Sequence, residues 1–309
     1  MPSFALLAKH LHLRTINSDS LMTSSKETAT LLIHCPDQGS LIATVTQFLS
    51  RHHGNIIDLD EHVDTEEEVF FMRVAWQMEG FSLAKDELRE TFAQEIAAPL
   101  QMTWSLHFSD RLPRMAIFVS KMSHCLYDLL SRVQSGEWKV EIPLIVSNHP
   151  QLETIAERFD MPFHHLPITP KHKHAQEIEQ LQLLESAGVD FIVLARYMQI
   201  LSQNFINQYP NRIINIHHSF LPAFPGAKPY HSAHKRGVKL IGATSHYVTA
   251  DLDAGPIIAQ DVAHISHKDS VSELVRKGRD LEKIVLSRAV YQHLQRKTLV
   301  FNNRTVVFD

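Results

Sequence analysis

The sequence predicts an α/β protein with two domains: a ferredoxin-like βαββαβ domain, then a doubly wound, mostly parallel Rossmann-like domain. The length of 309 residues exceeds that of one ordinary small domain. After a short polar start, apolar runs follow in the order strand, helix, strand, strand, helix, strand over about 80 residues. From residue 115 onward, short β-branched runs alternate with helical stretches, a pattern typical of a parallel sheet covered by helices.

The first domain is expected over residues 27–107, and each of its elements follows from apolar spacing. Its helices are amphipathic; we expect Gly54 to end the first and Ser82 to be the N-cap of the second. The predicted elements are strand 28–35, helix 39–54, strands 55–64 and 68–78, helix 82–97 and strand 100–108. Residues 108–114, which include Pro113, are expected to form a linker.

The second domain is expected over residues 115–309. Its predicted strands are 115–120, 141–148, 190–195 and 212–217, with helices at 124–136, 152–159 and 174–188 between them. In doubly wound sheets, ligands bind beyond the carboxyl ends of the strands. Asn215 and His217 lie at such an end, which makes them candidate site residues.

Two acidic residues, Asp251 and Asp253, follow the next predicted strand. If that strand is a parallel neighbour of strand 212–217, Asp253 comes within reach of Asn215 and His217. An amide, an imidazole and a carboxylate in one cleft suit a reaction that passes through a tetrahedral oxyanion. Taken singly, Asn215 and Asp253 are equally typical of turns, so the prediction depends on their joint occurrence.

Composition excludes several function classes. A net charge of −4, without a basic run interleaved with aromatic residues, argues against nucleic-acid binding. No apolar stretch reaches the roughly 20 residues that span a bilayer. Cys35 and Cys125 are too few for a disulfide framework, which favours a reducing, cytoplasmic location. Residues 1–26 lack a proper apolar core for a targeting signal, and we expect them to be a poorly ordered extension.

The 21 histidines raise the alternatives of a solvated surface and a metal site. His217, His218, His231 and His234 are the candidate ligands, and the last two have an H-x-x-H spacing. Zinc sites usually add a carboxylate or cysteine ligand, which residues 231–234 lack, so we expect no metal.

Residues 215–226 and 242–260 closely resemble the folate-dependent formyltransferase/hydrolase family, whose signature pairs Asn-x-His with Leu-Asp-x-Gly-Pro. The signature falls on Asn215, His217 and Asp253, and the likeness covers about residues 114–297. It implies that 10-formyltetrahydrofolate is the substrate and that no cofactor is needed. The implied folate-pocket residues are Leu194, Arg196, Tyr197, Met198, Ile200, Leu201, Val248 and Thr249.

Residues 27–107 resemble an ACT domain through the segments 34–49, 54–64 and 70–74. The resemblance implies a homo-oligomer and an effector site for a small metabolite such as methionine or glycine. The effector would bind at the turn Asp37, Gln38, Gly39 and Ser40. A domain that serves only for association is an equal alternative.

The loop after strand 115–120 distinguishes the activities within the family. Members that act on glycinamide ribonucleotide carry a Gly/Ser-rich phosphate loop there, whereas residues 119–130 contain no glycine. Lys121, His124 and His231 are expected to replace the amine-acceptor site, which leaves water as the acceptor. The implied reaction is hydrolysis of 10-formyltetrahydrofolate to tetrahydrofolate and formate, in one-carbon and purine metabolism. Formyl transfer to a small amine, and an amino-acid sensor with a degenerate catalytic domain, are the alternatives.

The resemblance implies a role for each catalytic residue. Asn215 donates a hydrogen bond to the oxyanion, His217 donates and carries protons, and Asp253 orients His217. Whether His217 or Asp253 takes the proton from water stays open. His218 departs from the wider family, which often has proline there, and is expected to stiffen the loop less.

Overall fold

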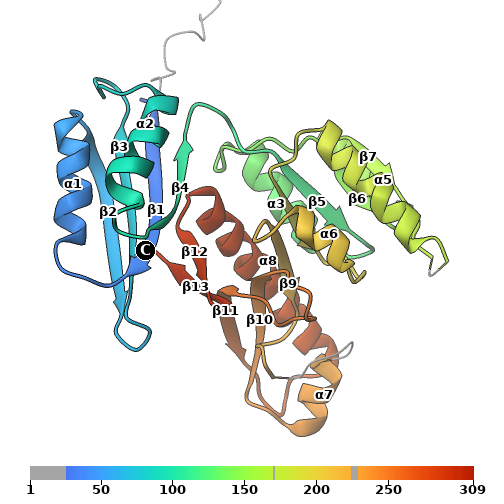
Figure 1. Cartoon of the computed structure of the whole chain (residues 1–309). Coiled ribbons are helices and arrows are strands. Elements are labelled where there is room, and N and C mark those ends of the chain that lie inside the picture. Colours follow the sequence, from blue (N-terminus) through green and yellow to red (C-terminus); the bar gives the residue numbers. More distant parts are fainter. Residues whose placement is uncertain (1–25, 170, 224–228) are drawn as a thin grey trace, which may run out of the picture.

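The computed structural model describes residues 26–169, 171–223 and 229–309, so most of the expected extension 1–26 lies outside it. The N-terminal part is a four-stranded antiparallel sheet of order β2-β3-β1-β4 (Figure 1). Its elements are β1 (Thr28–Pro36), α1 (Leu41–Arg51), β2 (Asn55–Asp64), β3 (Val69–Gln77), α2 (Lys85–Phe92) and β4 (Thr103–Phe108). This is the predicted βαββαβ order.

The two faces of this sheet pack against different parts of the chain. Alternate residues of β1, such as Leu31 and Ile33, pack against α1 and α2 together with Phe48 and Phe92. The opposite face presents Leu32 and Phe71. The prediction of Ser82 as the N-cap of the second helix is wrong, because α2 begins after Ala84 and the Ser82 hydroxyl instead contacts His52. A π-helical turn over Ala93–Ala97 extends α2.

The second sheet has seven strands in the order β11-β10-β9-β8-β5-β6-β7. Strands β5 to β9 pair in parallel, and β10 and β11 are antiparallel. The strands are β5 (Met115–Val119), β6 (Ile145–Ser147), β7 (Phe163–His165), β8 (Phe191–Ala195), β9 (Ile213–His217), β10 (Leu240–Tyr247) and β11 (Ile257–His264). The predicted fold class, α/β with a mostly parallel second sheet, is confirmed.

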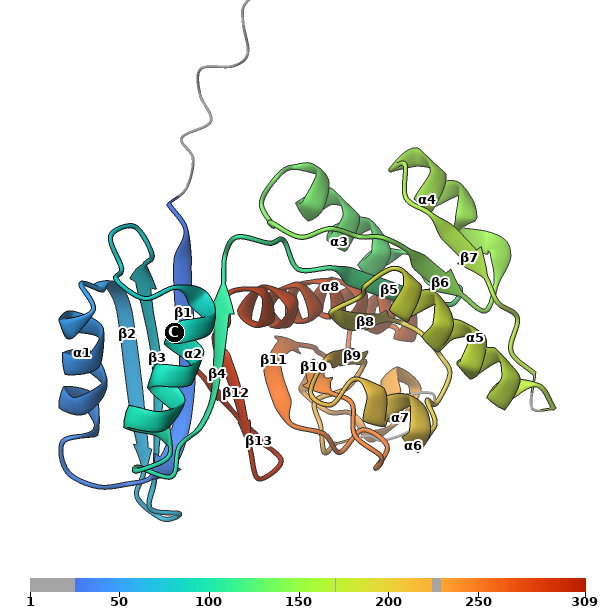
Figure 2. The same ribbon diagram turned by 45° about the horizontal axis from the view of Figure 1, so that its top comes forward.

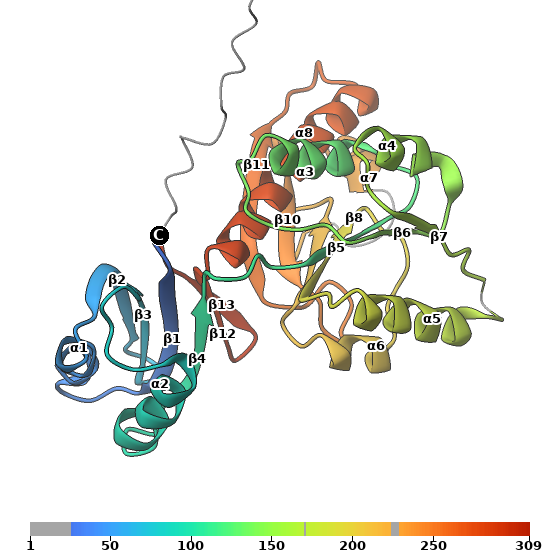
Figure 3. The ribbon, with the colours of Figure 1, turned by 90° about the horizontal axis from the view of Figure 1, so that it is seen from above.

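Helices cover both faces of this sheet (Figure 3). One face holds α3, α4 and α8, whose apolar residues form the larger core, and the other holds α5 and α6. The helices are α3 (His124–Gln134), α4 (Glu153–Arg158), α5 (Lys173–Ser186), α6 (Gln203–Gln208), α7 (Pro229–Arg236) and α8 (Val271–Leu294). Helix α8 begins with a capping box in which Ser270 and Glu273 satisfy each other's backbone N–H groups. No helix within the described residues combines the length and apolar content needed to cross a lipid bilayer.

The two sheets meet through the C-terminal hairpin β12 (Thr298–Phe301) and β13 (Arg304–Val307), visible beside β4 in Figure 2. Leu299 and Phe308 pack on Leu32 and Phe71 of the four-stranded sheet. Arg73 of β3 donates to the carbonyl of Arg296 at 3.0 Å and that of Gln295 at 3.3 Å, just beyond the end of α8. A cation at this position complements the negative end of the helix dipole.

One assumption about the second sheet is wrong. The expected proximity of Asp253 to His217 supposed a parallel strand, but β10 runs antiparallel to β9, with Thr244 opposite His217 and His246 opposite Asn215. Both faces of β10 are buried, so its sequence lacks the alternation that distinguishes an antiparallel strand open to water. A return of the loop after β10, rather than parallel pairing, brings Asp253 to the site.

Candidate active site

The ends of β8, β9 and β10 surround a pocket of about 710 Å³. All eight predicted folate-pocket residues line it, as do Asn215, His217 and Asp253. Its walls are mainly apolar, and Met198, Ile200 and Leu252 expose much of their side chains at its rim. A mostly apolar pocket with a few converging polar groups is the usual form of a small-molecule site.

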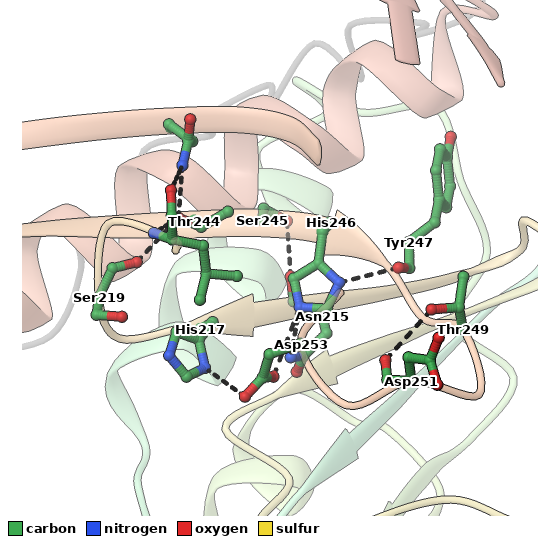
Figure 4. A network of polar contacts seen from close by, with 12 residues as sticks. Asn215, His217, Ser219, Thr244, Ser245, His246, Tyr247, Thr249, Asp251 and Asp253 are labelled. Atoms are coloured by element: carbon green, nitrogen blue, oxygen red, sulfur yellow. Dashed lines mark hydrogen bonds and ion pairs between the residues drawn. The ribbon is translucent and has the colours of Figure 1, made fainter. Parts of the chain in front are cut away.

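His217 and Asp253 contact each other at the polar end of this pocket (Figure 4). The imidazole Nδ1 lies 3.2 Å from the carboxylate Oδ2, and His217 is only 6% exposed. A carboxylate accepts hydrogen bonds, so Nδ1 carries the proton and Nε2 keeps its lone pair in the neutral ring. Nε2 is buried and has no hydrogen-bond partner among the described residues. It is therefore free to exchange a proton with a bound molecule.

Asp253 remains ionised throughout the physiological pH range. The hydrogen bond from His217 holds the pKa of Asp253 well below its ordinary value, and the His246 ring, whose Nε2 lies 3.8 Å from Oδ1, acts in the same direction, against the opposing effect of burial. A carboxylate with so low a pKa is a poor proton acceptor near neutral pH. The geometry thus favours orientation of His217 as the task of Asp253.

His246 fixes the orientation of the Asn215 amide. Its Nδ1 lies 2.9 Å from the carbonyl oxygen of Tyr247, which can only accept, so Nδ1 carries the proton. Its Nε2 therefore accepts from Nδ2 of Asn215 at 3.2 Å. The second hydrogen on Nδ2 remains available to a ligand. His246 was not among the residues predicted from the sequence; a histidine inside the apolar run of β10, seven positions before Asp253, was the available signal.

The loop after β10 turns back sharply at Gly255. A Cβ at this position would lie 1.8 Å from the carbonyl oxygen of Tyr247, so no other residue fits there. The backbone N–H of Tyr247 donates to Pro256 at 2.9 Å, which closes the loop. This close return, with Asp253 at a positive φ of 55°, carries the carboxylate over β9.

Thr244 holds the loop that follows β9. Its hydroxyl donates to the carbonyl of Ser219 at 2.9 Å and accepts from the backbone N–H of Leu221 at 3.0 Å. Gln260 of β11 also donates to Thr244 Oγ1 at 2.9 Å. The loop that follows His217 and His218 is thus tied to β10 and β11 by hydrogen bonds at Ser219 and Leu221.

The segment after β8 is held by buried polar contacts behind the pocket. The N–H of Met198 donates to Oγ of Ser120 at 3.0 Å, and Gln180 donates to the Tyr197 hydroxyl at 3.2 Å. Burial raises the pKa of Tyr197 to about 12, so the phenol is neutral. These contacts give the apolar wall a fixed shape.

A buried carboxylate, Glu282 of α8, joins the pocket to two helices. Its side chain accepts from Tyr230 of α7 at 2.9 Å and contacts Nε2 of His124 at 2.7 Å. Nε of Arg196, a pocket residue, lies 3.4 Å away. Contacts with His124, Arg196 and Tyr230 lower the pKa of Glu282 although burial acts in the opposite direction. Glu282 was not among the residues predicted from the sequence; an acidic residue on the buried face of α8 was the available signal.

The three residues predicted to replace the acceptor site do not gather in the pocket. His124 binds Glu282, while Lys121 and His231 are exposed, and none of the three is among the described residues that line the pocket. The histidines considered as metal ligands do not form a cluster with His124. Among the described residues, His124, Cys125 and Glu282 form the one group of three with metal-ligand atoms within 4.8 Å. Glu282 is already held by its hydrogen bonds, and burial raises the pKa of Cys125 well above its ordinary value.

The predicted effector turn lies between β1 and α1. The positive φ falls on Ser40, at 71°, rather than on Gly39, and no side chain caps the helix. The N–H of Asp37 donates to Glu68 at 2.8 Å.

Comparison with known proteins decides the family. The formyl transferase family model matches residues 113–290. A formyltetrahydrofolate deformylase of Synechocystis is 57% identical over 281 residues, which are 91% of this chain and 98% of the relative. This chain belongs to the formyltetrahydrofolate deformylase family. The deformylase of Bacillus subtilis is 46% identical over 94% of this chain and 97% of its own.

Solved structures separate the deformylase family from the transferases. The crystal structure of a formyltetrahydrofolate deformylase from Pseudomonas syringae has a TM-score of 0.90 and 45% identity, covering 94% of this chain and 97% of that one. A glycinamide ribonucleotide transformylase from Symbiobacterium toebii has a TM-score of 0.61 and 29% identity, and it covers only 66% of this chain but 98% of its own. The deformylase structure therefore aligns with nearly the whole chain, whereas the transformylase structure aligns with only about two thirds of it.

Proposed function

We propose that Asn215, His217 and Asp253 catalyse the hydrolysis of 10-formyltetrahydrofolate to tetrahydrofolate and formate. Membership of the deformylase family supports the reaction and disfavours both a transferase and a non-catalytic sensor. The folate is the substrate rather than a cofactor. The free Nε2 of His217, directed by Asp253, is the observation on which the assignment of residues depends.

Water attacks the formyl carbon, and negative charge develops on the formyl oxygen. The free N–H of Asn215 would donate to that oxygen, a contribution of about 10²–10³ in rate for one oxyanion donor. His217 Nε2 would take the proton from water, because the Asp253 carboxylate, with its lowered pKa, is too weak a base for this step. The same imidazole then returns the proton to N10 as the bond to the formyl carbon breaks.

The pocket residues are assigned to the pterin. The apolar wall formed by Met198, Ile200 and Leu201 would cover the ring, with Val248 and Thr249 opposite. Leu194, Arg196 and Tyr197 complete this wall. His124 has a different role from the one expected, since it binds Glu282 and would act through Arg196 rather than by blocking an amine.

Formate release from 10-formyltetrahydrofolate by the purified chain tests the function. We expect formate without an added amine, unaffected by a chelator, and lost in Asp253→Asn. Formyl transfer only in the presence of an amine would contradict hydrolysis, and loss of activity with the chelator would restore a metal role. Asp261→Asn, which removes a half-exposed carboxylate of β11 that pairs with Arg288, is the matched control.

We assign a regulatory, ACT-like role to residues 27–107, with 108–114 as linker and 115–309 as the catalytic domain. Because the first turn of α1 has no capping side chain, its backbone N–H groups suit the carboxylate of an amino acid such as methionine or glycine, bound at Asp37–Ser40. We also propose that the protein forms a homo-oligomer in which the four-stranded sheets of neighbouring subunits lie side by side. A cytoplasmic location and a role in purine biosynthesis are the remaining parts of the proposal. Methionine titration of the wild type and Ser40→Pro, with sedimentation analysis, tests the site and the oligomer.

A further inference from the structure

A second crevice, of about 370 Å³, lies where the two sheets meet. One wall comes from β1 and β4 of the four-stranded sheet, and the other from the end of α8 and from β12. It is separate from the folate pocket, with which it shares no lining residue among those described. A molecule bound in the crevice would contact both sheets.

Arg296 brings an unpaired positive charge into this crevice. Its guanidinium makes no hydrogen bond or ion pair with the described residues, and burial lowers its pKa. Its backbone is fixed, because its carbonyl accepts from Arg73 and its N–H donates to His293 at 3.1 Å. The negative charge of Asp190 favours the charged form of Arg296. The Asp190 carboxylate, however, accepts hydrogen bonds from Arg111 at 2.6 Å and from the N–H of Arg114 at 2.8 Å, not from Arg296. The Arg296 side chain is half-buried, and a charge partly removed from water is stabilised by pairing, so this guanidinium is open to an anion.

The other polar groups of the crevice are neutral or, like Arg212, already engaged in hydrogen bonds. Burial lowers the pKa of His107 and of His293 to about 3, so both rings are neutral near pH 7. His293 contacts the Tyr247 hydroxyl at 2.8 Å, and His107 contacts Ser105 at 3.1 Å. Arg212 is engaged with the carbonyl of Gln208 at 2.8 Å. Arg296 thus supplies the unengaged charge.

The remaining lining selects the kind of anion. Leu32, Trp104, Leu299 and Val300 give the crevice apolar walls. A planar guanidinium binds a carboxylate through two parallel hydrogen bonds. We propose that this crevice is a binding site for a small monocarboxylate with an apolar substituent, held by Arg296 between the two sheets. The site lies behind Tyr247, whose carbonyl accepts from His246.

Calorimetry with sodium butyrate tests the site on the full chain, with tetrahydrofolate saturating the active site. We expect saturable binding with a Kd of about 1 mM. Arg296→Gln should weaken it at least tenfold and Arg296→Lys less, while Arg288→Gln, which changes an exposed arginine of α8 paired with Asp261, should leave it unchanged. Butyramide, the neutral analogue, should not bind.

Three outcomes would overturn the proposal. The first is absence of butyrate binding to the wild type, and the second is equal binding to Arg296→Gln. The third is saturable binding of inorganic phosphate without butyrate, which would exclude the carboxylate class. If Arg296→Gln fails to fold, Ser105→Trp decides: it adds bulk from β4 while leaving the arginine, and it should abolish butyrate binding. The measurement does not depend on turnover, so its failure is distinct from failure of the deformylase assignment.

Discussion

The contact between the imidazole of His217 and the carboxylate of Asp253 fixes which ring nitrogen of His217 carries the proton. Nδ1 lies 3.2 Å from Oδ2, while Nε2 is buried without a partner among the described residues. The carboxylate therefore determines which nitrogen carries the proton, and the other nitrogen is available for catalysis. Two residues that act in this way form one functional unit, and their substitutions should not be additive.

We expect His217→Gln and Asp253→Asn each to lower kcat by about 10²–10⁴. The double variant should be no more than about tenfold slower than the worse single variant, because either change already disables the unit. Single-turnover formate release measures all three. Losses that multiply would show that the two residues act independently.

His246→Phe should lower kcat by about 10–100-fold with little change in KM. Without an acceptor at Nε2, the Asn215 amide loses the contact that orients it, while apolar binding of the folate persists. His246→Gln, which keeps an acceptor, should recover part of the rate. In an Asn215→Leu background, the His246 substitution should have little further effect; a full additional loss would contradict a role through Asn215.

The contribution of Asp253 to stability should depend on pH. Because its pKa is lower in the folded than in the unfolded protein, the stabilisation is complete above the unfolded value of about 3.9 and declines as pH falls toward the folded value. Urea unfolding of the wild type and Asp253→Asn should differ most at pH 5–7, and the difference should shrink below about pH 4. A constant difference would contradict the lowered pKa of Asp253 in the folded protein.

His293 should destabilise the protein in acid. Its pKa falls from 6.5 to about 3 on folding because of burial, so between these values the unfolded chain binds the extra proton. Stability should then decrease by about 1.4 kcal/mol per pH unit as pH falls through this window. His293→Gln should remove that part of the slope in urea unfolding between pH 6 and 4. An unchanged slope would show that His293 is not the group responsible.

Gly278→Ala should destabilise the fold by about 1–3 kcal/mol, although alanine normally favours a helix. The added Cβ would lie 2.1 Å from the Tyr230 hydroxyl, which would have to leave Glu282. Gly39→Ala, where nothing lies within 4 Å of the added atom, is the control for urea unfolding. In a Tyr230→Ala background, Gly278→Ala should cost little; an equal cost there would contradict the contact.

The apolar patterns predicted most strands and the fold class, because long β-branched runs and amphipathic helices leave clear periodicities. Strand β7 (Phe163–His165) has only three residues, too few to show a periodicity. The direction of β10 was also inaccessible, since a strand buried on both faces looks the same whether it is parallel or antiparallel. The hairpin β12–β13 was missed, and it carries the contact between the two sheets.

Within the site, the family signature placed Asn215, His217 and Asp253 in one pocket with every predicted folate-pocket residue. It did not provide the residues that fix them. Glu282 reaches His124 and Tyr230 from a helix far along the chain, and such a contact depends on how α3, α7 and α8 pack. No spacing within the sequence encodes that packing.

The close return at Gly255 sets a limit for engineering. The strand before it and the turn after it are joined through Tyr247 and Pro256, so the segment between them has a fixed span. Inserting even one residue between Thr249 and Gly255 would displace the carboxylate from the imidazole while leaving both sheets intact. Grafting this segment from another enzyme can therefore succeed only at equal length, and a change in length offers a simple way to produce a folded, inactive protein that retains the apolar wall of the pocket.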